Sequence, residues 1–370
     1  MKLSLEQDAA AQAVSEWLKR KDQPIFRLFG YAGTGKTTLA RHIAETVRGE
    51  VLFCAFTGKA AQVLRSKGCD NARTIHSLIY RPKGEPTVDE ETGSISPSFT
   101  LNRGSAVSNA KLVIVDECSM VDEALGRDLL SFGTPILVLG DPGQLPPVSG
   151  GGFFTDAEPD FLLTEVHRQA RDNPIIAMAD AIRQGGRLDY GDYGESRVIR
   201  RGEITADQVL AADQVLVGTN KSRRAYNRRI RDLKGFVGLM PASGDKLVCL
   251  RNNTEKGLLN GSLWKVLHVG KVKGVAQDLM IRSEEEGPLG DTVKVKVPVA
   301  AFEGEEELPY LLKRRFDDFD YGYALTVHKA QGSQWDNLIL FDESWAFKEY
   351  RDRWLYTAIT RAAVRVTMVR

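Results

Sequence analysis

The sequence has few of the residues that build disulfide frameworks and zinc sites. Its 370 residues include four cysteines, and no two of them have Cys-x-x-Cys spacing. Three of the four lie in apolar runs, as is typical of reduced thiols in a protein core. The pattern disfavours a secreted disulfide scaffold and a zinc module. The cysteines are Cys54, Cys69, Cys118 and Cys249.

Membrane-length apolar runs and a strong net charge are also missing. The N-terminal stretch MKLSLEQDAAAQAV mixes polar with apolar residues, and no other segment approaches the length that spans a bilayer. We therefore expect an intracellular, cytoplasmic protein with no membrane partner. The 50 Lys and Arg residues nearly balance the 49 Asp and Glu residues, leaving a net charge of +1. Binding to a polyanion would then depend on a local basic face.

Seven apolar runs alternate with segments of helical period and predict buried strands. Such runs are typical of parallel strands covered on both faces, so the alternation predicts an α/β fold with doubly wound sheets. A chain of 370 residues exceeds the usual size of one core, and four runs precede residue 150 while three follow residue 210. Two α/β lobes are therefore expected. The runs cover residues 25–30, 51–57, 111–117, 134–141, 212–220, 337–344 and 364–370.

Two segments interrupt this alternation. Residues 80–109 are rich in Gly, Pro and Ser and poor in apolar side chains, which predicts a small hairpin or loop insertion. Residues 235–315 alternate polar with apolar residues between Gly and acidic turns, as in DTVKVKVPV. That pattern predicts a small β-barrel or sheet inserted in the second lobe.

The stretch GYAGTGKTT, residues 30–38, has the spacing G-x-x-x-x-G-K-[ST] between a predicted strand and a predicted helix. Its glycines let the backbone turn tightly, so that N–H groups face bound phosphates. Lys36 is expected to reach the β and γ oxygens of ATP, and Thr37 to ligate Mg²⁺. The predicted nucleotide contacts in this P-loop are Gly30, Gly33, Thr34, Gly35, Lys36, Thr37 and Thr38.

An acidic pair and an amide follow two later predicted strands. In KLVIVDE, Asp116 is suited to hold Mg²⁺ and Glu117 to polarise an attacking water. A surface Asp-Glu pair is common in isolation, but a P-loop in the same chain favours the catalytic interpretation. In VLGDPGQLPPV, Gln144 can sense the γ-phosphate or orient water, although alone this segment would be an ordinary turn. The three motifs predict an NTPase, but they do not show which process its hydrolysis of NTP drives.

Five further segments make the sequence resemble the superfamily 1 DNA helicases of the 1B type, in particular the RecD-like and Dda-like branch. They occur in the family's order, and with Gln7 the resemblance covers nearly the whole chain. As an ordered set they are far more specific than the P-loop. The segments are AFTGKAA (55–61), TIHSLIY (74–80), LTEVHRQ (163–169), ALTVHKAQGSQW (324–335) and LYTAITRA (355–362), which resemble motifs Ia, Ic, IV, V and VI.

The resemblance implies two tandem RecA-like P-loop domains that bind ATP between them. It makes Arg361 and Arg168 the arginines that reach the γ-phosphate, and Gln7 the glutamine that reads adenine. Gly332 and Gln334 are implied nucleotide contacts, although some relatives have glutamate in place of Gln334. The implied activity is ATP-dependent DNA unwinding, with travel 5′ to 3′ on single-stranded DNA.

A track for DNA is implied as well, made of hydroxyls and short basic side chains at strand ends. Alternatives stay open: Thr57 can cap a helix, and a lone histidine is more often structural. Phe99 stands where relatives carry a pin that splits the duplex, and a hairpin core is an equal alternative. For the basic stretch 220–235 a solvated surface is favoured. The implied track residues are Thr57, Lys59, Thr74, His76, Asn220, Thr326, His328 and Lys329.

The predicted domain division follows from these motifs. The first RecA-like domain takes residues 1–79 and 110–165 around a hairpin insertion at 80–109. The second takes 166–234 and 316–370 around an SH3-like β insertion at 235–315. The implied partners are single-stranded DNA and ss/ds DNA junctions, met by an active monomer in replication, recombination or repair. Two alternatives stay open: an NTPase or phosphotransferase indifferent to nucleic acid, and a DNA-binding subunit of a larger complex.

Overall fold

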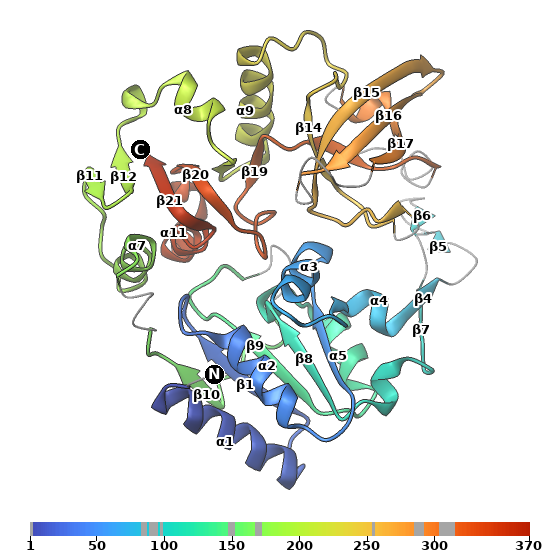
Figure 1. Cartoon of the computed structure of the whole chain (residues 1–370), viewed down its shortest axis with the longest axis vertical. Coiled ribbons are helices and arrows are strands. Elements are labelled where there is room, and N and C mark those ends of the chain that lie inside the picture. Colours follow the sequence, from blue (N-terminus) through green and yellow to red (C-terminus); the bar gives the residue numbers. More distant parts are fainter. Residues whose placement is uncertain are drawn as a thin grey trace.

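The computed structural model has two lobes, each built on a mainly parallel sheet, and a smaller antiparallel sheet attached to the second lobe (Figure 1). Among the described residues, no helix combines the length and apolar character needed to cross a bilayer. The structure describes residues 3–82, 87–88, 95–96, 99–146, 152–166, 172–253, 256–284, 292–302 and 315–370.

The sheet of the first lobe has six strands: β1 (Ile25–Gly30), β2 (Val51–Ala55), β3 (Arg73–Thr74), β8 (Leu112–Asp116), β9 (Ile136–Gly140) and β10 (Phe161–Leu163). Their order is β10-β1-β9-β8-β2-β3, and every neighbouring pair is parallel. The four inner strands are the four apolar runs predicted before residue 150, because strands covered on both faces must be apolar. The edge strands β3 and β10 are too short to show a period.

Helices cover both faces of this sheet: α1 (Leu5–Arg20), α2 (Lys36–Thr46), α3 (Gly58–Ser66), α4 (Ile75–Ile79) and α5 (Glu123–Leu130). Val14, Leu39 and Leu64 from α1, α2 and α3 share one apolar core. Ile75 and Leu125 from α4 and α5 belong to a second core, which contains the alternate residues of the same strands. The sheet therefore lies between two packed layers of helices.

The sheet of the second lobe also has six strands: β11 (Gly191–Tyr193), β12 (Ser196–Ile199), β13 (Gln214–Val217), β19 (Ala324–Thr326), β20 (Trp335–Phe341) and β21 (Ala362–Val369). In the order β11-β12-β21-β20-β13-β19, only β11 and β12 pair antiparallel. The three apolar runs predicted after residue 210 form β13, β20 and β21. The helices of this lobe are α7 (Pro174–Arg183), α8 (Ala206–Leu210), α9 (Asn220–Leu233) and α11 (Arg351–Ile359).

Between α9 and β19 the chain forms a five-stranded antiparallel sheet: β14 (Lys246–Cys249), β15 (Leu263–Lys273), β16 (Ala276–Ser283), β17 (Thr292–Pro298) and β18 (Phe319–Tyr321), in the order β17-β16-β15-β14-β18. The alternating pattern predicted here appears in β15, β16 and β17. β18 lies beyond the predicted range 235–315, because a strand of three residues shows no period. The SH3-like description stays a prediction.

The segment predicted as a hairpin contains two short antiparallel pairs. β4 (Tyr80–Pro82) pairs with β7 (Phe99–Leu101), and β5 (Thr87–Val88) pairs with β6 (Ile95–Ser96). The Tyr80 hydroxyl donates to Asp128 of α5. This bond ties the base of the β4–β7 pair to the first lobe.

The basic stretch 220–235 contains α9. Most of its Lys and Arg side chains are exposed, as expected for a solvated surface, but Arg223 and Arg231 are buried. Arg231 donates to Asp245 at 3.0 and 2.9 Å, and Arg223 donates to Asp320 of β18 at 2.5 Å. Arginine is buried when its charge is paired in this way. These two arginines therefore join the second lobe to the five-stranded sheet.

Candidate functional site

The P-loop lies where β1 ends and α2 begins. Gly33 and Gly35 have φ angles of 81° and 76°, a left-handed conformation that glycine adopts without steric cost. Gly35 precedes α2, and no described side chain caps this helix start. The N–H groups of the first turn and the helix dipole therefore favour an anion at this point.

Lys36 turns its ammonium group back onto the loop. Its Nζ donates to Gly30 O at 2.5 Å and to Tyr31 O at 3.0 Å. It also lies 4.0 Å from Asp141 Oδ2. Carbonyl oxygens are weaker partners for a cation than charged oxygens, so the loop holds Lys36 near the site in a form that can exchange partners.

The residues predicted to hold magnesium are in contact. Thr37 Oγ1 donates to Asp116 Oδ2 at 2.9 Å. Mg²⁺ prefers such oxygen ligands and usually takes only about one or two from the protein, with water and phosphates completing its shell. In the part of the chain that the structure describes, no three His, Cys, Asp or Glu side chains gather as a metal cluster. The pair fits a cation shared with a phosphate.

Glu117 follows β8 in an uncommon backbone conformation. Its φ of 52° and ψ of 45° lie in the left-handed region, which side chains other than glycine seldom adopt. Asp116 Oδ1 accepts its N–H at 2.8 Å and supports this bend. Burial raises the pKa of the Glu117 carboxyl above its ordinary value, whereas the charge of Arg361 opposes the rise. A carboxylate with a raised pKa accepts protons more readily.

Gln144 lies in the loop after β9, where its N–H donates to Asp141 O at 3.1 Å. The residue is 8% exposed, and its Oε1 has no hydrogen-bond partner among the described residues. An unpartnered buried amide oxygen is unfavourable, so this atom fits a site where water or a ligand donates a hydrogen bond.

Arg361 reaches the same place from the second lobe, just after α11. Its Nε donates to Thr357 O at 3.2 Å and its Nη1 to Ser333 O at 3.3 Å. Nη2 donates to Thr360 Oγ1 at 3.2 Å. Nη1 also lies 4.0 Å from Glu117 Oε1 of the first lobe. Neutral oxygens of its own lobe thus hold the guanidinium while it faces the carboxylates across the cleft.

One cavity of about 560 Å³ contains all of these groups. Lys36, Glu117 and Gln144 line it from the first lobe, and Arg361 lines it from the second. The structure therefore brings together the lysine near one end of the sequence and the arginine near the other. Their catalytic roles stay predictions. The other predicted residues on its walls are Gly33, Gly35, Thr37, Thr38, Asp116, Gly332 and Gln334.

The remaining predicted nucleotide residues lie beside the P-loop or outside the described residues. Gln7 Nε2 donates to Thr34 O at 3.1 Å, and Gln7 Oε1 accepts the Ser4 N–H at 3.2 Å. Gln7 thus joins α1 to the loop, and its adenine contact stays a prediction. Gly30 needs to be glycine, since a Cβ there would lie 2.6 Å from Thr34 Oγ1. Arg168 lies outside the described residues.

Two contacts of the second lobe on the P-loop were missed by the sequence analysis. Tyr356 OH accepts the Ala32 N–H at 2.8 Å and donates to Asp141 Oδ2 at 2.8 Å. The Arg183 guanidinium of α7 lies 3.9 Å from the centre of the Tyr31 ring. Tyr356 lies within LYTAITRA, but no local pattern pairs it with Ala32, 324 positions away.

The predicted track threonines lie at the carboxyl ends of strands and cap the turns that follow. Thr57 and Thr74 Oγ1 each accept the N–H three residues on at 3.1 Å, at the starts of α3 and α4. Thr326 Oγ1 accepts the Lys329 N–H at 3.4 Å. The helix-cap alternative for Thr57 is therefore observed. A capping hydroxyl still has a hydrogen to donate, so the cap is compatible with a phosphate contact.

His76 and Phe99, predicted separately, lie against each other. Their ring centres are 4.4 Å apart in an edge-on arrangement, and Tyr80 lies 4.6 Å from His76. Phe99 is 44% exposed, which disfavours the hairpin-core alternative. Burial lowers the pKa of His76, so its ring is neutral at physiological pH. The three rings form a partly exposed aromatic cluster on the first lobe.

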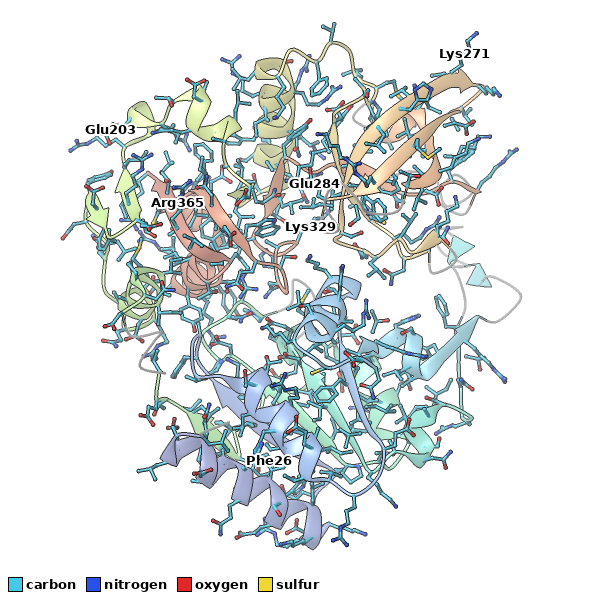
Figure 2. The ribbon with its side chains drawn as sticks, in the orientation of Figure 1. Phe26, Glu203, Lys271, Glu284, Lys329 and Arg365 are labelled. Carbon is cyan, nitrogen blue, oxygen red and sulfur yellow. The ribbon has the colours of Figure 1, made fainter. Side chains whose placement is uncertain are left out.

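The other track residues lie on both lobes. Asn220 starts α9 and accepts from Arg223 Nε at 3.3 Å, and the His328 ring lies 5.6 Å from that of Phe347. Lys329 is exposed after β19, on the side of the second lobe that faces the first (Figure 2). Lys59 of α3 lines a second cavity.

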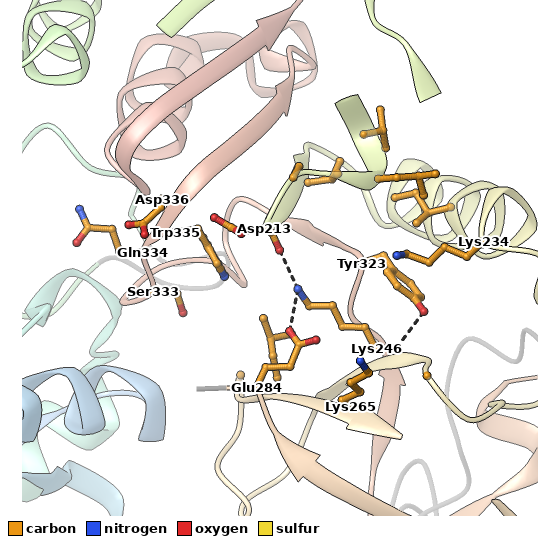
Figure 3. Close-up of a pocket in the computed structure, with 18 of the residues that line it drawn as sticks. Asp213, Lys234, Lys246, Lys265, Glu284, Tyr323, Ser333, Gln334, Trp335 and Asp336 are labelled. Atoms are coloured by element: carbon orange, nitrogen blue, oxygen red, sulfur yellow. Dashed lines mark hydrogen bonds and ion pairs between the residues drawn. The ribbon is translucent and has the colours of Figure 1, made fainter. Parts of the chain in front are cut away.

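This second cavity, also about 560 Å³, shares Ser333 and Gln334 with the first (Figure 3). Its central lysine, Lys246, donates to Asp213 O at 2.8 Å and pairs with Glu284 at 3.0 Å. No P-loop residue lines it. The chemistry for phosphate binding belongs to the first cavity, which is the candidate site.

Two family models match parts of this chain. A family model described as an AAA domain matches residues 2–204, and one described as a UvrD-like helicase C-terminal domain matches residues 321–369. The ATP-dependent RecD2 DNA helicase of Deinococcus radiodurans is 29% identical over 355 residues, which cover 91% of this chain and 46% of that protein. The chain thus spans about half of that relative.

A second relative matches from end to end. The ATP-dependent DNA helicase dda of Enterobacteria phage T4 is 25% identical over 443 residues, covering 98% of each chain. Among solved structures, a Bacteroides Pif1 helicase in complex with ADP-AlF3 and ssDNA has a TM-score of 0.59 at 19% identity, covering 99% of this chain and 92% of that one. That likeness supports two tandem RecA-like domains. With its AAA domain, its RecD and Dda relatives and its Pif1-like fold, the chain belongs to the superfamily 1B helicases.

Proposed function

We propose that the chain is an ATP-driven DNA helicase that travels 5′ to 3′ on single-stranded DNA and unwinds duplex at ss/ds junctions. The observation that carries the proposal is the single cavity lined by Lys36 and Glu117 of the first lobe and by Arg361 of the second. Among the described residues, the phosphate cradle comes from the first lobe, whereas the only arginine that lines the cavity, Arg361, comes from the second. Hydrolysis would therefore require the lobes to close.

Each residue has a distinct part in the proposed reaction. Lys36 binds the phosphate oxygens, and Thr37 and Asp116 hold Mg²⁺, which when bound neutralises phosphate charge. Glu117 accepts the proton of the attacking water. Gln144 orients that water through its side-chain oxygen Oε1. This oxygen fits the role because no described group donates a hydrogen bond to it.

Arg361 completes the site by stabilising the charge that develops on the transferred phosphoryl group. We propose that Arg168 assists it and that Gln7, Gly332 and Gln334 contact the nucleotide. Loss of the γ-phosphate removes the charge partner of the two arginines and lets the lobes separate.

The lobe motion would move DNA because each lobe carries part of the track. Thr57, Thr74 and His76 belong to the first lobe, and Thr326 and His328 belong to the second. DNA as the track is supported by the relatives' names, and a single strand by the ssDNA in the Bacteroides Pif1 complex. The direction of travel and action as a monomer rest on family resemblance. The domain division given above, with its SH3-like insertion, is part of the same proposal.

An ATPase assay with and without an oligonucleotide tests this function. We expect strong stimulation by single-stranded DNA and its loss in Lys36→Ala, with Lys19→Ala as the control because Lys19 is exposed on α1. Turnover indifferent to DNA would favour a phosphotransferase, and no turnover at all would favour a binding subunit. Unwinding of only 3′-tailed duplexes would refute the direction.

A further inference from the structure

One buried hydroxyl connects the two lobes at the P-loop. Tyr356 of α11 is 2% exposed, and its oxygen accepts the Ala32 N–H at 2.8 Å. The same hydroxyl donates to Asp141 Oδ2 at 2.8 Å. Burial raises the pKa of Tyr356, so the group keeps its proton at ordinary pH. The Tyr356 hydroxyl thus donates one hydrogen bond and accepts another, and both bonds cross from the second lobe to the first.

The carboxylate oxygen of Asp141 that accepts this bond also lies near a second possible partner. Asp141 Oδ2 lies 4.0 Å from Lys36 Nζ, while Asp141 Oδ1 accepts the Gly143 N–H at 2.9 Å. Asp141 is 5% exposed, so its charge needs partners within the protein. If the Tyr356 hydroxyl moved away, the nearest cation to Asp141 among the described residues would be Lys36. An ammonium–carboxylate bond is stronger than the lysine's present bonds to carbonyl oxygens.

The second lobe holds this part of the first lobe at further points. Thr357 Oγ1 accepts the Leu145 N–H at 2.9 Å, and Gln331 Nε2 donates to Leu145 O at 3.2 Å. Gly143 leaves room for the tyrosine, since a Cβ there would lie 3.0 Å from a carbon of the Tyr356 ring. Movement of the second lobe must therefore alter the Tyr356 contact.

We infer that Tyr356 is a positioning residue through which the second lobe keeps Lys36 free for the triphosphate. While Tyr356 donates to Asp141, Lys36 stays on the loop carbonyls and can exchange them for phosphate oxygens. When the second lobe withdraws, Asp141 captures Lys36, and the P-loop loses its cation for ATP. Lobe position thereby sets ATP affinity as well as turnover. The inference rests on the proposed ATPase function.

Tyr323 provides a matched control within the same chain. Its hydroxyl donates to the buried Asp245 at 2.9 Å and accepts the Lys246 N–H at 3.1 Å, which is the same pair of bonds. This tyrosine lines the second cavity (Figure 3), which no P-loop residue lines. Tyr323→Phe therefore removes equivalent hydrogen bonds without touching Lys36.

The test compares ATP binding and hydrolysis in Tyr356→Phe, which keeps the ring and loses the hydroxyl. We expect the KM for ATP, and the Kd of a fluorescent ATP analogue, to rise about tenfold or more, as for a lost bond to a buried charged group. Affinity for single-stranded DNA should stay at the wild-type value. Tyr323→Phe should lower the melting temperature and leave the KM unchanged.

A rescue measurement separates the positioning role from a merely structural one. Asparagine at position 141 has no negative charge to capture Lys36, so Tyr356→Phe should change nucleotide affinity by less than about threefold when added to Asp141→Asn. An equal loss of affinity in both backgrounds, or a Tyr356→Phe variant with wild-type affinity, would overturn the inference. A wild-type chain without ATPase activity would instead overturn the proposed function.

Discussion

Replacing Arg361 by alanine should lower ATP turnover by about 10³- to 10⁵-fold while ATP still binds. That loss corresponds to roughly 4 to 7 kcal/mol of transition-state stabilisation. The guanidinium is well placed for it, because bonds to Thr357, Ser333 and Thr360 hold it at the cleft wall. Alanine removes this fixed charge and leaves the P-loop unchanged.

The ion pair with Glu117 is too weak to explain a loss of that size. Two unit charges 4.0 Å apart interact by about 1 kcal/mol in water and about 4 kcal/mol at an effective dielectric constant of 20. The Glu117 side chain is 25% exposed, so solvent screening favours the lower value. Contact with the transferred phosphoryl group must therefore dominate the effect on rate.

The ion pair has its own measurable consequence. Burial raises the pKa of Glu117 and Arg361 opposes the rise, so the pKa of Glu117 climbs further in Arg361→Ala. A general base acts only when deprotonated, and its activity is lost as pH falls through its pKa. The acidic limb of kcat/KM should therefore move to higher pH. Arg361→Lys keeps a charge and should move the limb less, but without the planar fork its turnover should stay low.

Single-turnover hydrolysis with saturating oligonucleotide measures both effects, and binding of a fluorescent ATP analogue shows that the site remains intact. Arg365→Ala is the matched control, because Arg365 is exposed on β21 of the same lobe (Figure 2). Turnover of Arg361→Ala within tenfold of wild type would remove the arginine from its proposed role. An unmoved acidic limb would refute Glu117 as the base.

Three further predictions follow from contacts at the cleft and the hairpin. Thr37→Val removes an oxygen from the proposed Mg²⁺ site and should raise the Mg²⁺ concentration for half-maximal ATPase by about tenfold; an unchanged titration would exclude this ligand. Gly332→Ala places a Cβ 2.9 Å from that of Ala60 in the other lobe, whereas Gly133→Ala, at a similar φ of 74°, meets nothing within 4 Å. Gly332→Ala should therefore slow ATP hydrolysis far more than Gly133→Ala. Both substitutions should lower the free energy of unfolding by about 1 to 3 kcal/mol, because both strain the backbone. Equal hydrolysis rates in the two variants would argue against lobe closure at this contact. Phe99→Ala should reduce unwinding of a 5′-tailed duplex and leave the DNA-stimulated ATPase intact, and a parallel loss of both would contradict the pin assignment.

Local patterns account for most of what the sequence predicts correctly. A buried parallel strand needs a continuous apolar run, so the seven runs correspond to β1, β2, β8, β9, β13, β20 and β21 of the two large sheets. A P-loop needs glycines at set spacing, because Gly33 and Gly35 must adopt positive φ. Both requirements are met by neighbouring residues, so they can be recognised without coordinates.

The convergence of Lys36 and Arg361 was predictable only because the whole ordered set of motifs resembles a known family. Elements without a period or motif were missed. β18 has three residues, and the buried state of Arg223 and Arg231 depends on carboxylates from other segments. A helical wheel shows which side chains share a face, but it does not show what packs against that face.

The sequence by itself determined the two α/β lobes, the phosphate cradle and the order of the cleft residues along the chain, since each depends on residues that are close together in sequence. Only the tertiary structure decided which partners the buried polar groups take. Tyr356 meets Asp141 across 215 positions and Gln7 meets Thr34 across 27, while Gln144 Oε1 meets no partner in the described chain. Such pairings arise because burial forces each polar group to use whichever partner packing brings within reach, whatever their separation in sequence.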